Sequence, residues 1–122
     1  MSAWSAWSAW SERPELPSST FEVEKGWIDE YGHMNAARYV EVFDREGFKL
    51  LEQLGVGLGY TEATRCGIYT VDIHVAYYRE LLVGSPVVLR VRALQSDDKR
   101  LLCLMELSHA TEGYVAATME QL

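Results

Sequence analysis

The spacing of apolar residues changes character along this chain, and this change limits the folds that it can form. Between residues 36 and 54 the apolar side chains recur every three or four positions, which predicts one amphipathic α-helix of about five turns. Elsewhere apolar and polar residues alternate, which predicts half-buried strands. Alternation is clearest over residues 20–27 and 68–78, and strands are also predicted over residues 86–94, 100–110 and 114–122. The expected fold class is α+β, with one long helix wrapped by a five-stranded antiparallel sheet.

The ends of the predicted helix carry residues that commonly begin and end helices. Asn35 is a favourable N-cap, and Gly55 is favourable just past the end. Gly47 lies inside the helix, where glycine is unfavourable, so we expect another backbone to approach closely there. Residues 55–67 are rich in glycine and predict a connection, and residues 96–99 predict a hairpin turn.

Length, charge and cysteine content narrow the range of functions. A chain of 122 residues predicts one domain with a core of its own. The formal net charge is −7 and no block of Lys or Arg occurs, so we expect no nucleic-acid partner and no membrane partner. No apolar run reaches membrane-spanning length. Cys66 and Cys103 are expected to be small core residues in a reducing cytoplasm, with one disulfide between them as the alternative.

The N-terminal residues differ in composition from the rest of the chain. Residues 2–10 repeat Ser-Ala-Trp three times, a pattern that fits neither a solenoid nor a signal peptide. We interpret the repeat as a tag-like segment, and the alternative is a Trp-bearing arm that docks on a partner. Residues 11–19 contain prolines and serines and predict a linker. We therefore expect residues 1–19 to be disordered and residues 20–122 to form the domain. At the other end, Leu122 falls inside an alternating pattern, so either a short tail follows or this strand ends the domain.

A short segment before the helix concentrates side chains that can carry chemistry. Residues 27–39, WIDEYGHMNAARY, place Asp29, His33 and Asn35 within seven positions. Thioester hydrolysis needs a carboxylate to activate water or to attack the carbonyl, and it needs donors for the oxygen that becomes negative. Unpaired N–H groups at a helix N-terminus are such donors. Asp29 is therefore the expected base or nucleophile, and the N–H groups around Asn35 and Ala36 are the expected donors.

The same segment resembles a known signature. The pattern W-x-D-x-x-G-H-M-N-x-x-x-Y-x-x-x-F, from Trp27 to Phe43, resembles the start of the 4-hydroxybenzoyl-CoA thioesterase-like branch of the hotdog acyl-CoA thioesterases. Later segments are similar to the betainyl-CoA thioesterases of bacterial carnitine degradation; they are LLEQLGVGLGY, YTVDIHVAYYREL, DDKRL and LSHATEGYVAATMEQL, in this order. The resemblance covers residues 20–122. It implies the hotdog fold, hydrolysis of an acyl-CoA without a cofactor, and clefts shared across a homodimer or a dimer of dimers.

Each candidate catalytic residue also has a purely structural interpretation. Asn35 is an ordinary helix cap, Asp29 is suited to a turn in which it bonds its own backbone, and His33 is suited to a structural loop. Their occurrence together inside the signature favours the functional interpretation. In it, Gly32 lets the backbone approach the substrate, and His33 and the Asn35 side chain position the acyl group or the water.

The resemblance to betainyl-CoA thioesterases suggests a substrate that ends in a trimethylammonium group. Proteins hold such groups with aromatic faces and carboxylates, and Trp27, Tyr31 and Tyr69 are expected nearest the site. The phosphates of CoA would need local cations, drawn from Arg79, Arg90, Arg92, Lys99 and Arg100. The expected substrate-binding residues are Trp27, Tyr31, Gly32, Met34, Ala36, Tyr39, Tyr69, Thr70, Asp72 and His74.

Two of these residues and several rival functions remain open on sequence grounds. Asp72 and His74 share one face of residues 68–78 with Thr70, and this face is either solvated or directed into the active site of a neighbouring protomer. The rival functions are a general short- or medium-chain acyl-CoA thioesterase and a non-catalytic acyl-binding hotdog module. A dehydratase would need an Asp–His pair after the helix, which is absent. No metal is expected, because no two potential ligands have a recognised spacing.

Overall fold

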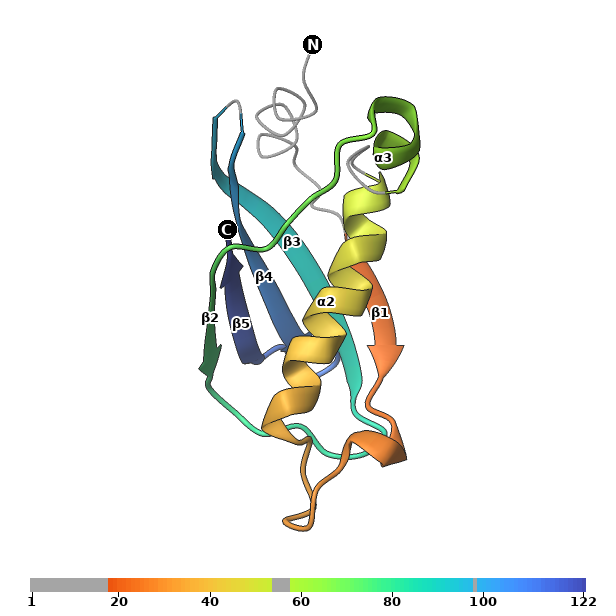
Figure 1. The fold of residues 1–122 in the computed structure, drawn as a ribbon. Coiled ribbons are helices and arrows are strands. Elements are labelled where there is room, and N and C mark those ends of the chain that lie inside the picture. The colour runs from red at the N-terminus through yellow and green to blue at the C-terminus, as the bar shows by residue number, and fades with distance from the viewer. Residues whose placement is uncertain (1–17, 54–57, 98) are drawn as a thin grey trace.

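The computed structural model describes residues 18–53, 58–97 and 99–122. Its elements, in chain order, are β1 (Ser18–Glu22), a 3-10 helix (Lys25–Trp27), α2 (Ala36–Gln53), α3 (Leu58–Thr64), β2 (Ile73–Tyr77), β3 (Pro86–Ser96), β4 (Leu101–His109) and β5 (Val115–Gln121). The five strands form one sheet in the order β1-β3-β4-β5-β2, and every neighbouring pair is antiparallel. The long helix α2 runs across one face of this sheet (Figure 1). The predicted α+β fold, one long helix with a five-stranded antiparallel sheet, is confirmed.

The core lies between α2 and the central strands. Phe43 and Leu50 of α2 are fully buried, as are Leu89 of β3 and Leu107 of β4. A Cβ added at Gly47 would lie 2.7 Å from Cε of Met105 on β4. The approaching group at Gly47 is thus a side chain, so the predicted approach of a backbone was wrong, although the position does leave no room for a Cβ.

The N-terminal strand begins and ends earlier than predicted. Ser18 and Ser19, assigned above to the linker, already pair with β3, and the strand ends at Glu22 opposite Pro86. Past this pair the backbone contact continues in a shifted register, because the Val23 N–H donates to the carbonyl of Ser85 and the Val23 carbonyl accepts the N–H of Gly84. The chain then turns through the 3-10 helix, which places Trp27 in the core. Residues 1–17 lie outside the described residues.

Two predictions in the middle of the chain were wrong. The connection expected over residues 55–67 contains the helix α3, and Gly55 lies outside the described residues. The strand expected over residues 68–78 is regular only over β2, since the segment before it pairs with the sheet only where Val71 and Asp72 bond to Leu122.

The cysteines differ in their surroundings. Both are free thiols; Cys103 is buried, and Cys66 is exposed after α3, so the core position predicted for Cys66 was wrong. Burial raises the pKa of the Cys103 thiol to about 11. In the described part of the chain, no helix has the length and apolar content needed to cross a bilayer.

Candidate active site

The loop that carries Asp29 is closed by hydrogen bonds along its own backbone. The Asp29 N–H donates to the carbonyl of His33 at 3.0 Å, and the Gly32 N–H donates to the carbonyl of Asp29 at 3.1 Å. Gly32 has a φ of +86°, in the left-handed region that favours glycine. Ile28 and Met34 form an isolated antiparallel bridge at the base of the loop. The loop thus holds the Asp29 side chain at a fixed place just before α2.

The two oxygens of the Asp29 carboxylate have different partners. Oδ1 accepts the N–H of Tyr31 at 2.8 Å, so Asp29 does make the local turn bond that its structural interpretation requires. Oδ2 lies 3.7 Å from Nδ1 of His33, and the Asp29 side chain is 18% exposed. One oxygen therefore fixes the orientation of the carboxylate, while the other faces the histidine and remains accessible to a water or a substrate.

The start of α2 uses almost all of its backbone donors. The side-chain oxygen of Asn35 accepts the N–H of Ala37 at 2.9 Å, which confirms that Asn35 caps the helix. The N–H groups of Met34 and Asn35 donate at 2.8 Å to the carbonyls of Leu81 and Trp27. Within the described residues the N–H of Ala36 has no acceptor.

This pattern refines the expected donor set for a negative oxygen. The backbone N–H of Asn35 is occupied by Trp27, so the available backbone donor is that of Ala36. The Asn35 side chain uses its oxygen as the cap, which leaves its amide nitrogen as a second donor beside Ala36. A helix N-terminus also favours negative charge through its dipole. The site therefore combines an oriented carboxylate with two donors on one helix start.

The aromatic residues around the loop are placed in different ways. Tyr31 is 77% exposed and stacks on His33, with the ring centroids 6.1 Å apart. Trp27 is buried, edge-on to Phe21, and the guanidinium of Arg45 lies 5.3 Å from the centre of its ring. Tyr31 is thus the aromatic side chain of the loop that a ligand can reach directly, whereas Trp27 supports the loop from the core.

Two tyrosines pack on the helix start, and the sequence analysis assigned a role to only one of them. Tyr39 is buried, and burial raises the pKa of its hydroxyl to about 12, although a hydrogen bond with the backbone of Leu81 acts in the opposite direction. Tyr77 of β2 lies edge-on to Tyr39, with the centroids 5.2 Å apart, and its hydroxyl donates to the carbonyl of Ala36 at 2.8 Å. The signal for Tyr77 was its place on the apolar face of the alternating segment 68–78.

Four expected substrate-binding residues lie away from this loop within one copy of the chain. Tyr69 is 86% exposed and lines a cavity beside the end of β5. The hydroxyl of Thr70 accepts a hydrogen bond from the side chain of Gln121 at 2.6 Å. Gln121 is opposite Ile73 in the register of the sheet, at the start of β2, whereas the loop lies at its Tyr77 end. In a single copy, Tyr69 and Thr70 therefore lie toward the opposite end of β2 from Asp29, although Thr70 also lines a cavity of about 480 Å³ that extends to Ala37 of α2.

Asp72 and His74 lie on the outer face of the sheet. Tyr77 reaches α2, so the odd positions of β2 face the helix, and the even position of His74 faces away from it. Asp72 has the same parity and exchanges two backbone hydrogen bonds with Leu122. Thr70 does not share this face, since it bonds to Gln121 on the helix side, and that part of the prediction was wrong.

The loop and helix start lie within the part of the chain that a family model recognises. The model described as the thioesterase-like superfamily matches residues 23–122. The chain belongs to this superfamily. The resemblance identified from the signature around Asp29 is thereby confirmed at the level of the superfamily, and the members' shared fold accounts for the helix-on-sheet arrangement.

Two curated relatives in the superfamily share a name for their activity. The chain is 34% identical over 101 residues to the L-carnitine dehydrogenase/betainyl-CoA thioesterase of Rhizobium meliloti, an alignment that covers 83% of this chain and 20% of that protein. It is 28% identical over 96 residues to the betainyl-CoA thioesterase of Pseudomonas aeruginosa, covering 79% of this chain and 60% of that protein. The chain thus spans only part of the length of either relative.

Two solved structures have the same fold. The protein SAV2348 of Staphylococcus aureus, solved in complex with CoA, superposes with a TM-score of 0.82 at 26% identity, covering 88% of this chain and 67% of the other. A 1,4-dihydroxy-2-naphthoyl-CoA thioesterase from Synechocystis superposes with a TM-score of 0.76 at 13% identity, covering 88% and 79%. At such an identity the second likeness shows the fold alone.

The side chains of the site are suited to acyl transfer to water. Among residues 18–53, 58–97 and 99–122, no three His, Cys, Asp or Glu side chains gather as a metal site would require. An oriented carboxylate beside unpaired N–H donors can instead generate a nucleophile and stabilise an oxyanion without a metal.

Proposed function

We propose that the protein is an acyl-CoA thioesterase that hydrolyses betainyl-CoA to betaine and CoA. The observation that carries the proposal is the placement of the Asp29 carboxylate one tight loop before the unpaired N–H of Ala36. A non-catalytic binding module needs the fold but does not need a carboxylate beside oxyanion donors. The names of the two curated relatives supply the acyl group.

The proposed reaction uses this chain's groups in distinct roles. The thioester oxygen accepts hydrogen bonds from the Ala36 N–H and the Asn35 amide, which stabilise the charge that develops on it. Oδ2 of Asp29 either takes a proton from the attacking water or attacks the carbonyl itself to form an anhydride that water then opens. In both routes the carbon–sulfur bond breaks and CoA leaves as the thiol. His33, 3.7 Å from Oδ2, orients the carboxylate or the water.

The cationic acyl group restricts where its binding residues can lie. Only one methylene separates the quaternary nitrogen of betaine from the reacting carbonyl, so its aromatic partners must surround the start of α2. Tyr31, exposed and stacked on His33, is the first candidate. Trp27, Met34 and Tyr39 are buried, so they shape this site from beneath. Tyr69 can contribute only from a second copy of the chain.

We propose that this second copy pairs through β2. Asp72 exchanges two backbone hydrogen bonds with Leu122, the residue after β5. Because hydrogen-bonded and non-hydrogen-bonded pairs alternate along an antiparallel ladder, the N–H and C=O groups of Ile73, Val75 and Tyr77 point away from β5, to the open edge of the sheet. Ile73 and Tyr77 also expose large parts of their side chains. Antiparallel pairing of two such edges would satisfy the backbone groups and cover the apolar ones.

A two-fold pairing has a consequence for the site. In a two-fold pairing the two β2 strands run in opposite directions. The start of β2 in one copy therefore lies beside the end of β2 in the other copy, and so beside the start of α2 of that other copy. Tyr69 and Thr70 of the second copy would then approach Ala36 of the first, as their predicted role in substrate binding requires. Asp72 and His74 would remain near the same junction but on the outer face of the joined sheet.

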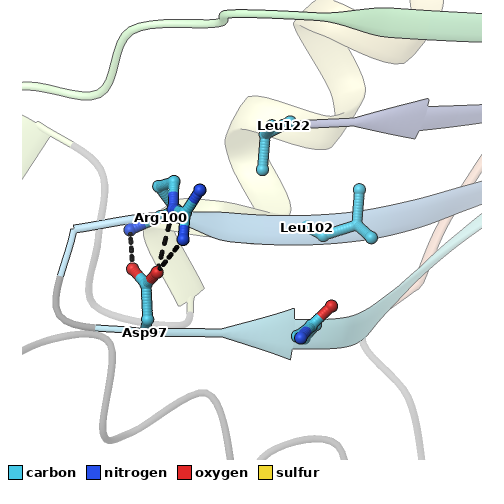
Figure 2. A pocket seen from close by; sticks show the side chains of 5 residues that line it. Asp97, Arg100, Leu102 and Leu122 are labelled. Carbon is cyan, nitrogen blue, oxygen red and sulfur yellow. Dashed lines mark hydrogen bonds and ion pairs between the residues drawn. The ribbon is translucent and has the colours of Figure 1, made fainter.

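The hairpin between β3 and β4 offers cations for the phosphates of CoA. A cavity of about 310 Å³ is lined by Lys99 and Arg100 together with apolar residues that include Leu101. Figure 2 shows the neighbouring pocket, where Arg100 is paired with Asp97. Within the described residues the Lys99 ammonium has no ion-pair partner. Lys99 is therefore the cation best placed to receive a phosphate, while Arg100 is already neutralised.

A substrate panel tests the proposal. Release of free thiol from betainyl-CoA should exceed release from a neutral isostere, with carbon in place of the quaternary nitrogen, by ~10-fold or more, because a desolvated cation–π contact contributes ~2 kcal/mol. Equal rates, or higher rates on long acyl chains, would leave a general acyl-CoA thioesterase. No release from any thioester would leave a non-catalytic binding module.

We also place the protein in the cytoplasm, since its cysteines are free thiols.

A further inference from the structure

One hydrogen bond joins the edge of the sheet to the first residue of α2. The hydroxyl of Tyr77 donates to the carbonyl of Ala36 at 2.8 Å across 41 positions of sequence. Tyr77 is the last residue of β2, and Ala36 is the residue whose own N–H has no acceptor in the described ranges. A contact from the sheet therefore reaches the residue that carries the expected oxyanion donor.

The ring of Tyr77 is held as well as its hydroxyl. It lies edge-on to Tyr39 at an interplanar angle of 90°, and Tyr39 is buried on the same face of α2 as Ala36, one turn further along. The Tyr77 hydroxyl is a protonated donor at neutral pH even at the ordinary tyrosine pKa of 10.0, and burial raises its pKa further. The side chain that bonds to Ala36 therefore also contacts the helix through its ring.

The other ties to the helix start come from loops. Met34 is bonded to Leu81, and Asn35 is bonded to Trp27, both through backbone groups. Among the described hydrogen bonds that reach residues 34–37 from outside this segment, the bond of Tyr77 is the one that comes from a strand. Tyr77 thus couples the direction of the first helical turn to the position of β2.

We infer that Tyr77 is a positioning residue, whose hydroxyl holds the first turn of α2 so that the Ala36 N–H is directed at the thioester oxygen. The inference rests on the proposed function. Donors stabilise a transition state best when they are already oriented before the reaction. Because the oxyanion develops only in the transition state, a loosened donor lowers kcat while KM changes little.

Two tyrosine substitutions separate this role from a structural one. Tyr77→Phe keeps the ring and removes the bond to Ala36. Tyr114→Phe is the matched control, because the Tyr114 hydroxyl makes the same kind of bond, to the carbonyl of Glu80 at 3.0 Å, away from α2. We expect Tyr77→Phe to lower kcat by about 3- to 10-fold with KM within about twofold, and Tyr114→Phe to keep kcat within about twofold.

A second measurement keeps the inference testable apart from the activity. In ¹⁵N-labelled protein, Tyr77→Phe should shift the Ala36 amide resonance and speed its hydrogen exchange, whereas Tyr114→Phe should leave both unchanged. Wild-type kcat in Tyr77→Phe, or an equal loss in Tyr114→Phe, would overturn the inference. If the wild type hydrolyses no thioester, the proposed function fails instead. In that case, an Ala36 amide resonance that does not shift in Tyr77→Phe would by itself overturn the positioning role of Tyr77.

Discussion

Strands β4 and β2 both direct apolar side chains toward α2 but are buried to very different extents. On the helix side of β4, Met105 is 1% exposed and Leu107 is fully buried. On the helix side of β2, Ile73 is 42% exposed and Tyr77 is 50% exposed. The difference follows from position, because β4 lies in the middle of the sheet beneath α2 and β2 lies at its edge (Figure 1). Alternation tells which face of a strand is apolar, but it does not tell whether the same chain covers that face.

The comparison bears on function because the candidate site lies beside the uncovered strand. Tyr77, at the end of β2, is bonded to the start of α2, one loop away from Asp29. The covered strand β4 contributes stability, while the exposed strand offers both its backbone and its side chains to a second copy. The substitutions below alter either the buried strand or the exposed strand and its neighbouring site, and they compare the effects on stability, turnover and assembly.

The largest expected effect is on the covered side. Leu107→Ala removes a fully buried side chain and leaves a cavity, which should lower the free energy of unfolding by ~2–5 kcal/mol. Leu94→Ala is the control, since Leu94 is 46% exposed on β3, and we expect a loss of less than ~1 kcal/mol. Urea denaturation at fixed protein concentration measures both. Similar losses in the two variants would contradict the burial contrast.

The next largest effect is on turnover rather than stability. Asp29→Asn retains an oxygen for the N–H of Tyr31 but removes the charge, so turnover should fall by at least ~10²-fold while the melting temperature changes little. Asp44→Asn makes the same change at an exposed position of α2 and should retain wild-type turnover. Steady-state thiol release and circular dichroism give the two readouts. Near-normal turnover by a folded Asp29→Asn protein would exclude Asp29 as base or nucleophile.

The sequence was sufficient for the fold and for the local geometry of the site. The change of period placed α2 within one residue of its observed ends in the described range, and Asn35 was correctly predicted as its cap. Such features depend on residues close together in the chain, so a local pattern contains the needed information. The predicted roles of Asp29 and His33 remain predictions, supported by their shared loop.

The errors arose where burial depends on distant partners. The apolar pattern over residues 68–78 predicted a long strand, but regular pairing needs residues opposite on β5, and only β2 has them. Thr70 was assigned to the outer face because alternation was extended through an irregular segment, whereas its bond to Gln121 turns it to the helix side. The bond of Tyr77 to Ala36 was not predicted, because the two residues are 41 positions apart and no local pattern indicates that contact.

A charge on the exposed strand should affect assembly without unfolding the chain. Ile73→Lys places an ammonium at the proposed interface, and the lost burial should weaken the dimer by ~2 kcal/mol, or about 30-fold in Kd. Leu94→Lys changes an equally exposed side chain on β3 and should leave the dimer intact. Light scattering over a dilution series decides between them, and activity should fall together with the dimer. An Ile73→Lys protein that dimerises like the wild type would exclude pairing through β2.

The other edge strand, β1, differs from β2 in that a buried charged side chain of α2 holds it. Glu46 of α2 is buried, and its carboxylate accepts hydrogen bonds from Ser19 of β1 and from Lys49, each at 3.0 Å. Burial alone would raise the pKa of Glu46, but these bonds and the charges of Lys49 and Arg45 outweigh it, so the pKa is lowered. Ionised Glu46 therefore stabilises the attachment of β1 to the helix.

The smallest expected effect is the pH dependence of that attachment. A carboxyl with a lowered pKa in the folded state contributes its full stability above its ordinary value of 4.5, and the contribution is lost as the pH falls below that value. Between pH 7 and pH 3, Glu46→Gln should therefore lose ~1 kcal/mol less stability than the wild type, the scale of one net hydrogen bond. Glu22→Gln, at an exposed end of β1, should follow the wild-type curve. Parallel curves for Glu46→Gln and the wild type would show that β1 is held by its ladder with β3 alone.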